Sequence, residues 1–163
     1  MTVTYEAITS TTLGSAQSSV VLGSGGTIPQ GYTDLVIVCN TGVTSTTNDY
    51  VRLNGDTGSN YSWTRMVGSG STATSSRGTN DTKMLVGDVT TTIVTTQIIH
   101  IQNYSNTTTN KTILTRSSSP NSAVTASVGL WRNTAAVTSV TLLPDGTTWL
   151  AGSTFSLYGI KAE

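Results

Sequence analysis

Short stretches in which apolar and polar residues alternate run along the whole chain, separated by clusters of turn-forming residues. Val, Ile, Thr and Tyr dominate these stretches, and Gly, Asn, Asp, Ser and Pro fill the gaps between them. A period of two among β-branched and aromatic residues is typical of strands, whereas a helix repeats its apolar residues at about 3.6 positions. No long stretch has the helical repeat, so the pattern predicts an all-β protein, a sandwich or a barrel.

The alternating stretches define the strands that we expect. They are Val3–Thr9, Ser18–Leu22, Asp34–Cys39, Asp49–Leu53, Lys83–Val86, Thr91–Asn103, Lys111–Arg116, Val124–Arg132, Ala136–Leu143 and Thr154–Lys161. The last strand has the clearest alternation, with Phe155 and Leu157 on one face and Tyr158 and Ile160 on the other. Because both faces are then apolar, we expect a second subunit to cover this strand, with Tyr158 and Ile160 at the assembly interface.

Two turns have a sequence-specific cause. Asn54 and Gly55 both tolerate a positive φ, which predicts a type I′ turn and a hairpin. Pro144-Asp145-Gly146 predicts a turn that ends the strand before it, because proline presets φ at the second turn position. Residues 23–31 contain too much glycine for regular structure and are expected to be a connection.

Residues 54–82 form the longest polar stretch, which we expect to be a loop on a rigid β scaffold. Tyr61, Trp63 and Arg65 lie within it and are candidates for contact with a partner or a glycan, because a flat aromatic ring can stack on a sugar. The alternative is structural: Trp63 fixes its own loop, while Trp131 and Trp149 are core or interface anchors.

Charge is scarce, and this narrows the classes of partner. Only 10% of the 163 residues are charged and the net charge is zero, whereas about 25% charged is usual. Such a chain has no field to attract nucleic acid or an anionic membrane. Thr, Ser, Asn and Gly occupy the polar positions instead, and a surface of neutral hydroxyls can pack against neighbours at little desolvation cost.

No internal repeat or linker divides the sequence, so we expect one domain, residues 1–163, with residues 1–10 as the first strand or a docking arm. No window is apolar enough for a membrane span, and the N-terminus has no secretory signal pattern. We therefore expect that the protein is made in a cytoplasm, or that the chain has already been processed.

Catalytic and metal-binding patterns are weak. His100 is the sole histidine and alternates with apolar neighbours, and Cys39 is the sole cysteine and follows an apolar run, so each is expected to be structural. A calcium site is the alternative, because oxygens could come together there from Asn54, Asp56, Ser59 and Asn60, although this spacing fits no EF-hand loop. We expect no enzyme activity, no cofactor and no metal.

Five segments resemble small virion proteins of tailed phages, notably those of marine and cyanobacterial hosts. They are residues 32–36 (Tyr32-Thr-Asp-Leu-Val36), 52–62, 101–106, 128–132 and 155–160. The resemblance covers most of the chain and implies a jelly-roll-like antiparallel β-sandwich, commonly a homotrimer, on the capsid or attached to the tail. No catalytic or ligand-binding residues can be carried over from it.

The sequence leaves three possible functions to be tested. A free-standing domain of this size favours a capsid decoration or cement protein, which binds the major capsid protein and stabilises the assembled shell. The alternative is a tail or fibre tip module that binds host surface glycans through Tyr61, Trp63 and Arg65. A hydrolase of surface polysaccharide is the third, and the sequence has no paired-carboxylate or histidine signature for it.

Overall fold

The computed structural model describes residues 4–23 and 27–161, which contain twelve strands and no helix. The strands are β1 (Tyr5–Thr12), β2 (Val20–Leu22), β3 (Asp34–Thr41), β4 (Thr47–Leu53), β5 (Tyr61–Gly68), β6 (Ala73–Asp81), β7 (Met84–Val89), β8 (Thr95–Gln102), β9 (Lys111–Ser119), β10 (Ala123–Trp131), β11 (Val140–Pro144) and β12 (Thr154–Ile160). All of the strand pairs are antiparallel. In the described residues, no helix could span a membrane.

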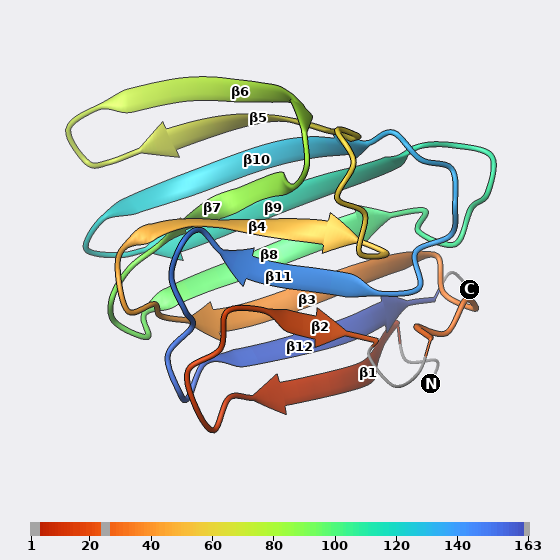
Figure 1. Cartoon of the computed structure of the whole chain (residues 1–163), viewed down its shortest axis with the longest axis horizontal. Coiled ribbons are helices and arrows are strands. Elements are labelled where there is room, and N and C mark those ends of the chain that lie inside the picture. The colour runs from red at the N-terminus through yellow and green to blue at the C-terminus, as the bar shows by residue number, and fades with distance from the viewer. Residues whose placement is uncertain (1–3, 24–26, 162–163) are drawn as a thin grey trace.

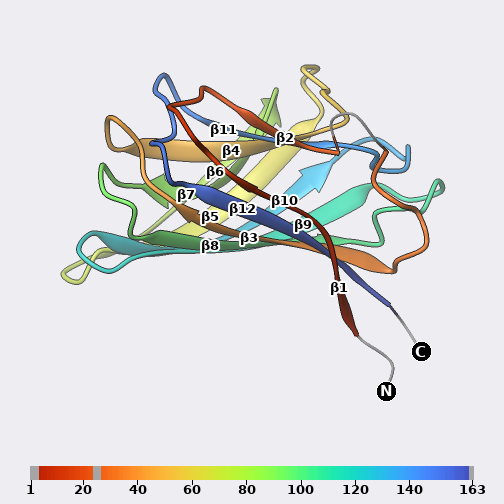
Figure 2. The same ribbon diagram turned by 90° about the horizontal axis from the view of Figure 1, so that it is seen from below.

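Two sheets pack face to face in a single-domain β-sandwich (Figures 1 and 2). The larger sheet has eight strands in the order β1-β12-β3-β8-β9-β10-β5-β6, and the smaller has four in the order β2-β11-β4-β7. Four neighbouring strands of the large sheet, β1-β12-β3-β8, and the four strands of the small sheet follow one another along the chain as β1, β2, β3, β4, β7, β8, β11 and β12. This connectivity of two four-stranded sheets is that of a jelly roll.

Two hairpins are added to the jelly roll, and both widen the same sheet. β9 and β10 are inserted between β8 and β11, and β5 and β6 are inserted between β4 and β7. β7 of the small sheet covers β9 and β10 and touches β5, whereas β6 lies beyond it, at the upper edge in Figure 1. The large sheet therefore extends past the small one on this side.

Apolar side chains from both sheets fill the interior of the jelly roll. Leu35, Ile37, Ile99 and Leu157 alternate inward from β3, β8 and β12 and are fully buried. Cys39 is buried among them, as expected, and burial raises the pKa of its thiol well above the ordinary value. This is the part of the molecule in which the hydrophobic alternation of the sequence reads directly as a core.

Where β9 and β10 pack against β7, hydrogen bonds from hydroxyl groups join the two sheets. The Thr115 and Ser127 hydroxyls donate to the Val86 carbonyl at 2.7 Å and 3.3 Å, and Ser117 donates to the Asp88 carbonyl at 3.1 Å. β7 is an edge strand of the small sheet, so these carbonyls have no neighbouring strand to bond. The large sheet supplies the missing donors across the layer, and buried hydroxyls replace apolar packing there.

Each expected strand corresponds to an observed one, but the prediction of a loop over residues 54–82 is wrong. Most of that stretch forms β5 and β6, which pair with each other as a hairpin. Its Ser, Thr and Gly content hid the strands, because β6 is an exposed edge strand with no apolar face. Residues 5–12 form the first strand, whereas residues 1–3 lie outside the described part.

The turn at Asn54-Gly55 is confirmed, but the hairpin is not. Both residues have positive φ, 52° and 66°, and the Asp56 amide donates to the Leu53 carbonyl at 3.0 Å. The chain then crosses to the large sheet instead of returning along β4. Asn54 is held by the connection before β11, because its side-chain oxygen accepts from the Thr138 amide at 2.7 Å. Tertiary contacts thus decide where the turn leads.

Candidate interaction surface

The outer face of the large sheet, which points away from the small sheet, has an inverted polarity in β9 and β10. In β10, Thr125 and Ser127 are buried, while Val124 and Val128 are 60% and 43% exposed. In β9, Thr115 is buried while Leu114 is exposed. An isolated soluble sandwich usually shows the opposite alternation. The apolar side of these strands is therefore available for a contact outside the described chain.

Cross-strand pairing places the apolar side chains of the outer face in adjoining rows. One row runs Val36, His100, Leu114, Val128 and Thr64 across β3, β8, β9, β10 and β5. The next row runs Val38, Ile98, Arg116, Ala126 and Met66 across the same strands. Directly opposed residues share a face of the sheet, so the two rows form one continuous band.

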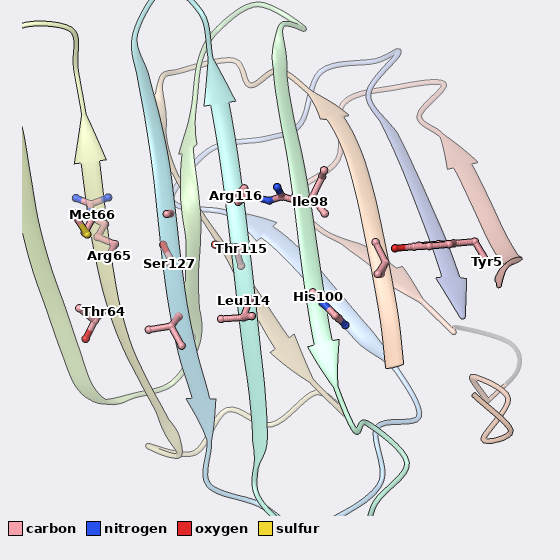
Figure 3. Close-up of a pocket in the computed structure, with 13 residues that line it drawn as sticks. Tyr5, Thr64, Arg65, Met66, Ile98, His100, Leu114, Thr115, Arg116 and Ser127 are labelled. Atoms are coloured by element: carbon pink, nitrogen blue, oxygen red, sulfur yellow. The ribbon is translucent and has the colours of Figure 1, made fainter. Parts of the chain in front are cut away.

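The band lines a shallow trough of about 550 Å³. Figure 3 shows Leu114, Ile98 and Met66 projecting from three different strands, with Tyr5 extending from β1 at the far side. Met66 is 66% exposed and Tyr5 is 54% exposed. We call this surface, together with the adjoining outer side of β6, the outer trough. The wall of this hollow is mostly apolar.

Few charges lie on this surface, and they are not balanced. His100 Nε2 lies 3.0 Å from Asp34 Oδ2, and Asp34 also accepts the Asn103 amide at 2.7 Å. The side chains of Arg116 on β9 and Arg77 on β6 make no hydrogen bond or ion pair with other described residues. Arg77 pairs with Thr64 and so shares the outer face.

Tyr61 lies on the inner side of β5 and is fully buried, so it cannot contact a glycan in this structure. Its ring stacks on Trp131 with centroids 6.4 Å apart, and its hydroxyl accepts the Leu53 amide at 3.0 Å. Burial raises the pKa of Tyr61 to about 12. Tyr61 is thus a core residue that fixes the start of β5 against the end of β4.

Trp63 and Arg65 also lie on the inner side of β5, and structural contacts occupy both. The Trp63 indole donates to Asp81 Oδ2 at 2.6 Å and packs against the edge of the core. Arg65 lies 3.4 Å from Asp88 Oδ1 and donates to Asn48 Oδ1 at 3.0 Å. The three residues therefore form no common aromatic platform, and the alternative interpretation, that Trp63 is structural, agrees with its contacts.

Tyr158 and Ile160 lie where the alternation of the last strand predicts. Both are half-buried on the outer side of β12, and Phe155 and Leu157 are buried on its inner side. Tyr158 pairs with Val36, so the candidate assembly residues adjoin the outer trough at its β12 end. Their role in assembly stays a prediction.

The remaining chemistry-bearing groups do not converge on one site. Asp56 Oδ2 accepts the Trp131 indole and the Asn60 amide at 2.6 Å and 2.9 Å, which uses its oxygens inside the protein. Burial raises the pKa of Asp56, but these hydrogen bonds and one from Gly58 outweigh it and lower the pKa overall. In the described residues, no group of three or more His, Cys, Asp or Glu side chains could hold a metal ion.

Sequence reasoning missed the outer trough because it assigned apolar alternation to the core. The signal that could have found it is the sequence of β10, in which Val124, Ala126, Val128 and Leu130 alternate with small and hydroxyl residues. The alternation is correct, but its apolar side faces outward.

Among known proteins, no family model matches this chain and no curated protein is significantly similar to it in sequence.

Proposed function

We propose that this protein is a structural component of a tailed-phage virion, a decoration or cement protein that binds the assembled capsid shell and stabilises it. The observation that carries the proposal is the inverted polarity of β9 and β10, which exposes Leu114, Val124 and Val128. Contiguous exposed apolar surface on a soluble domain is typical of a protein interaction site. A protein that binds only the assembled shell stabilises that shell by mass action.

Two further features support a role in assembly. The jelly-roll connectivity occurs in viral capsid proteins, although lectins and enzymes of the cupin type share it. Charged side chains make up only 10% of the chain, so close packing among many copies costs little desolvation. The resemblance of five segments to small virion proteins is what narrows assembly to the virion.

We infer further that the protein acts as a homotrimer, in contact through Tyr158 and Ile160 on the outer side of β12. Cyclic association closes the assembly and suits a local threefold position of a shell. Sedimentation equilibrium should give a trimer for the wild type and a monomer for Tyr158→Lys. A monomeric wild type at micromolar concentration contradicts the trimer.

Shell binding is tested by mixing the purified protein with undecorated shells of its phage and sedimenting them. Val128→Lys should reduce the bound fraction at least tenfold, because the charge would be buried without a partner. Val21→Lys is the matched control, since Val21 is 41% exposed but lies on β2 of the small sheet, and it should bind as the wild type does. Equal binding by all three proteins, or no matching density on the virion in cryo-electron microscopy, contradicts the proposal.

A glycan-binding tail or fibre tip module is the second candidate. The observation that favours it is a hollow of about 300 Å³ on the outer face beside β6, where Ser62, Thr64, Thr79 and Thr112 bring hydroxyl groups together. A glycan array with the wild type and Thr79→Val decides it. Binding of a defined glycan that the variant loses supports this function, and no binding by either protein removes it.

A further inference from the structure

Arg116 and Arg77, the two arginines of the outer trough, differ from the other basic residues in the contacts of their side chains. Every other described lysine and arginine side chain makes an ion pair or a hydrogen bond. Lys161 pairs with Glu6 at 2.7 Å, Lys83 with Asp145 at 2.6 Å and Arg65 with Asp88, while Arg52, Lys111 and Arg132 donate to uncharged oxygens. Arg116 and Arg77 have no such partner among the described residues, and both lie on the outer face of the widened part of the large sheet. We propose that the outer trough binds an extended, acidic segment of another protein, whose carboxylates pair with Arg116 and Arg77.

The spacing of the two arginines defines that segment. Arg116 is on β9 and Arg77 on β6, three strands away, which is about 14 Å across the sheet. Their rows differ by two residues, about 7 Å along the strands, so the two backbones are about 16 Å apart. An extended chain covers about 13 Å in four residues, and the arginine side chains reach the rest. Carboxylates at positions i and i+4 also project from the same side of such a chain.

The surface between the arginines is apolar. Leu114, Ala126, Val128 and Met66 lie there, and pairing across β9, β10 and β5 makes them contiguous. A side chain at position i+2 of the bound segment would face this surface. The recognised sequence pattern is therefore acidic, any, apolar, any, acidic. Guanidinium–carboxylate pairs hold the two acidic side chains, and a neutral polar side chain in their place would bind the arginines more weakly.

A second copy of this chain does not supply such a segment. The acidic side chain on the outer face of the described strands is Asp34, and His100 and the Asn103 amide already engage it. Two outer troughs facing each other would bring arginines together without carboxylates to oppose them. A different protein with acidic residues would supply the carboxylates that the two arginines lack. In the proposed function that protein is the capsid shell, so the identity of the partner rests on the proposed function.

The test uses ¹⁵N-labelled protein and three acetylated, amidated peptides. The first is Ser-Glu-Thr-Leu-Thr-Glu-Ser, the second replaces both Glu by Gln, and the third replaces Leu by Ser. The first peptide should shift the amide resonances of Leu114, Val128 and Arg116, and the other two should bind at least about tenfold more weakly. Arg116→Gln and Arg77→Gln should each weaken the first peptide to a similar degree.

Arg52→Gln is the control, because Arg52 lies on β4 of the small sheet and its side chain donates to the Thr82 carbonyl. Equal shifts with the Glu and Gln peptides, or no shift with the Glu peptide, overturn the inference. Shifts of the same resonances by polygalacturonate but not by the Glu peptide also overturn it, because the acidic partner would then be a polysaccharide.

The shell assay separates this inference from the proposed function. Shell binding that survives in the double variant Arg77→Gln, Arg116→Gln overturns the acidic-segment inference and leaves the decoration role intact. A wild type that binds the Glu peptide but no shell overturns the decoration role and leaves the inference intact.

Discussion

Asp49 projects from β4 into the space between the sheets, where it is 1% exposed. Burial raises its pKa well above the ordinary value, and the Gln97 amide counteracts this only in part, because no well-formed hydrogen bond reaches either carboxyl oxygen. The charge of Asp88 raises the pKa further. An acidic group that keeps its proton in the folded state makes folding depend on pH in the opposite sense from a salt-bridged carboxylate.

We predict that Asp49→Asn removes part of this pH dependence. In the unfolded chain Asp49 loses its proton near pH 4, whereas its raised pKa keeps the proton on the folded protein to higher pH, so the contribution of Asp49 to stability falls as the pH rises above about 4. Asparagine has nothing to titrate, so as the pH rises above about 4 the free energy of unfolding of the variant should fall less, or rise more, than that of the wild type. Urea unfolding followed by tryptophan fluorescence at several pH values measures the difference.

Glu6 and Asp56 act in the opposite direction, which is why the comparison with Asp49→Asn is needed. The hydrogen bond from Lys161 lowers the pKa of Glu6, and the pKa of Asp56 is lowered too, so each stabilises the fold as pH rises. Both contributions cancel between wild type and variant. Parallel curves for the two proteins contradict a raised pKa at Asp49.

At the scale of the strand, β9 and β10 show that hydroxyl groups can hold two sheets together. Ser117 approaches β7 so closely that a Cβ on Gly87 would lie 2.4 Å from the Ser117 Cβ. A glycine in β7 lets the sheets meet at hydrogen-bonding distance, and the Thr125 hydroxyl then reaches Asp88 Oδ2 at 2.7 Å. Small residues and hydroxyl groups are therefore a packing device here as well as a polar surface.

Thr115→Val tests the contribution of these hydroxyls. Valine keeps the shape of the side chain but removes the 2.7 Å donor of the Val86 carbonyl, which retains only the longer bond from Ser127 at 3.3 Å, so the free energy of unfolding should fall by about 0.5–1.5 kcal/mol. Thr112→Val is the matched control on the outer side of β9, where no hydrogen bond is lost, and it should change stability by less than about 0.5 kcal/mol. Chemical unfolding of the three proteins gives both values, and an equal loss in the two variants contradicts the interlayer role.

Sequence patterns predict ten of the twelve strands, but they do not predict which face of a strand points into the core. In β12 the alternation coincides with burial, because Phe155 and Leu157 lie in the core. Val124 and Val128 alternate just as regularly and face outward, because the hydroxyls beside them bond to an edge strand that only the tertiary fold brings near. Tyr61 was assigned to a loop because its neighbours are polar. The local sequence pattern shows that residues alternate between two faces of a strand, but tertiary contacts decide which of these faces is buried.

For the whole molecule, the outer trough determines what binding should look like in a calorimeter. An interface of ordinary size buries about 1,600 Å² in total, a little more than half of it apolar. Burial of that surface should give a heat-capacity change near −0.2 kcal/mol/K, since apolar burial lowers heat capacity more than polar burial raises it. Titration of the protein into undecorated shells at several temperatures measures this change.

The charge content of the outer trough sets a second condition on the same titration. Only Arg116 and Arg77 would form new ion pairs, so the association constant should fall by roughly tenfold, and not by several orders of magnitude, between 50 mM and 500 mM salt. The heat-capacity change should persist at high salt, because apolar burial does not depend on ionic screening. A heat-capacity change near zero, or binding that vanishes in salt, would mean that the shell is held by charge and that the exposed valines and Met66 serve another contact.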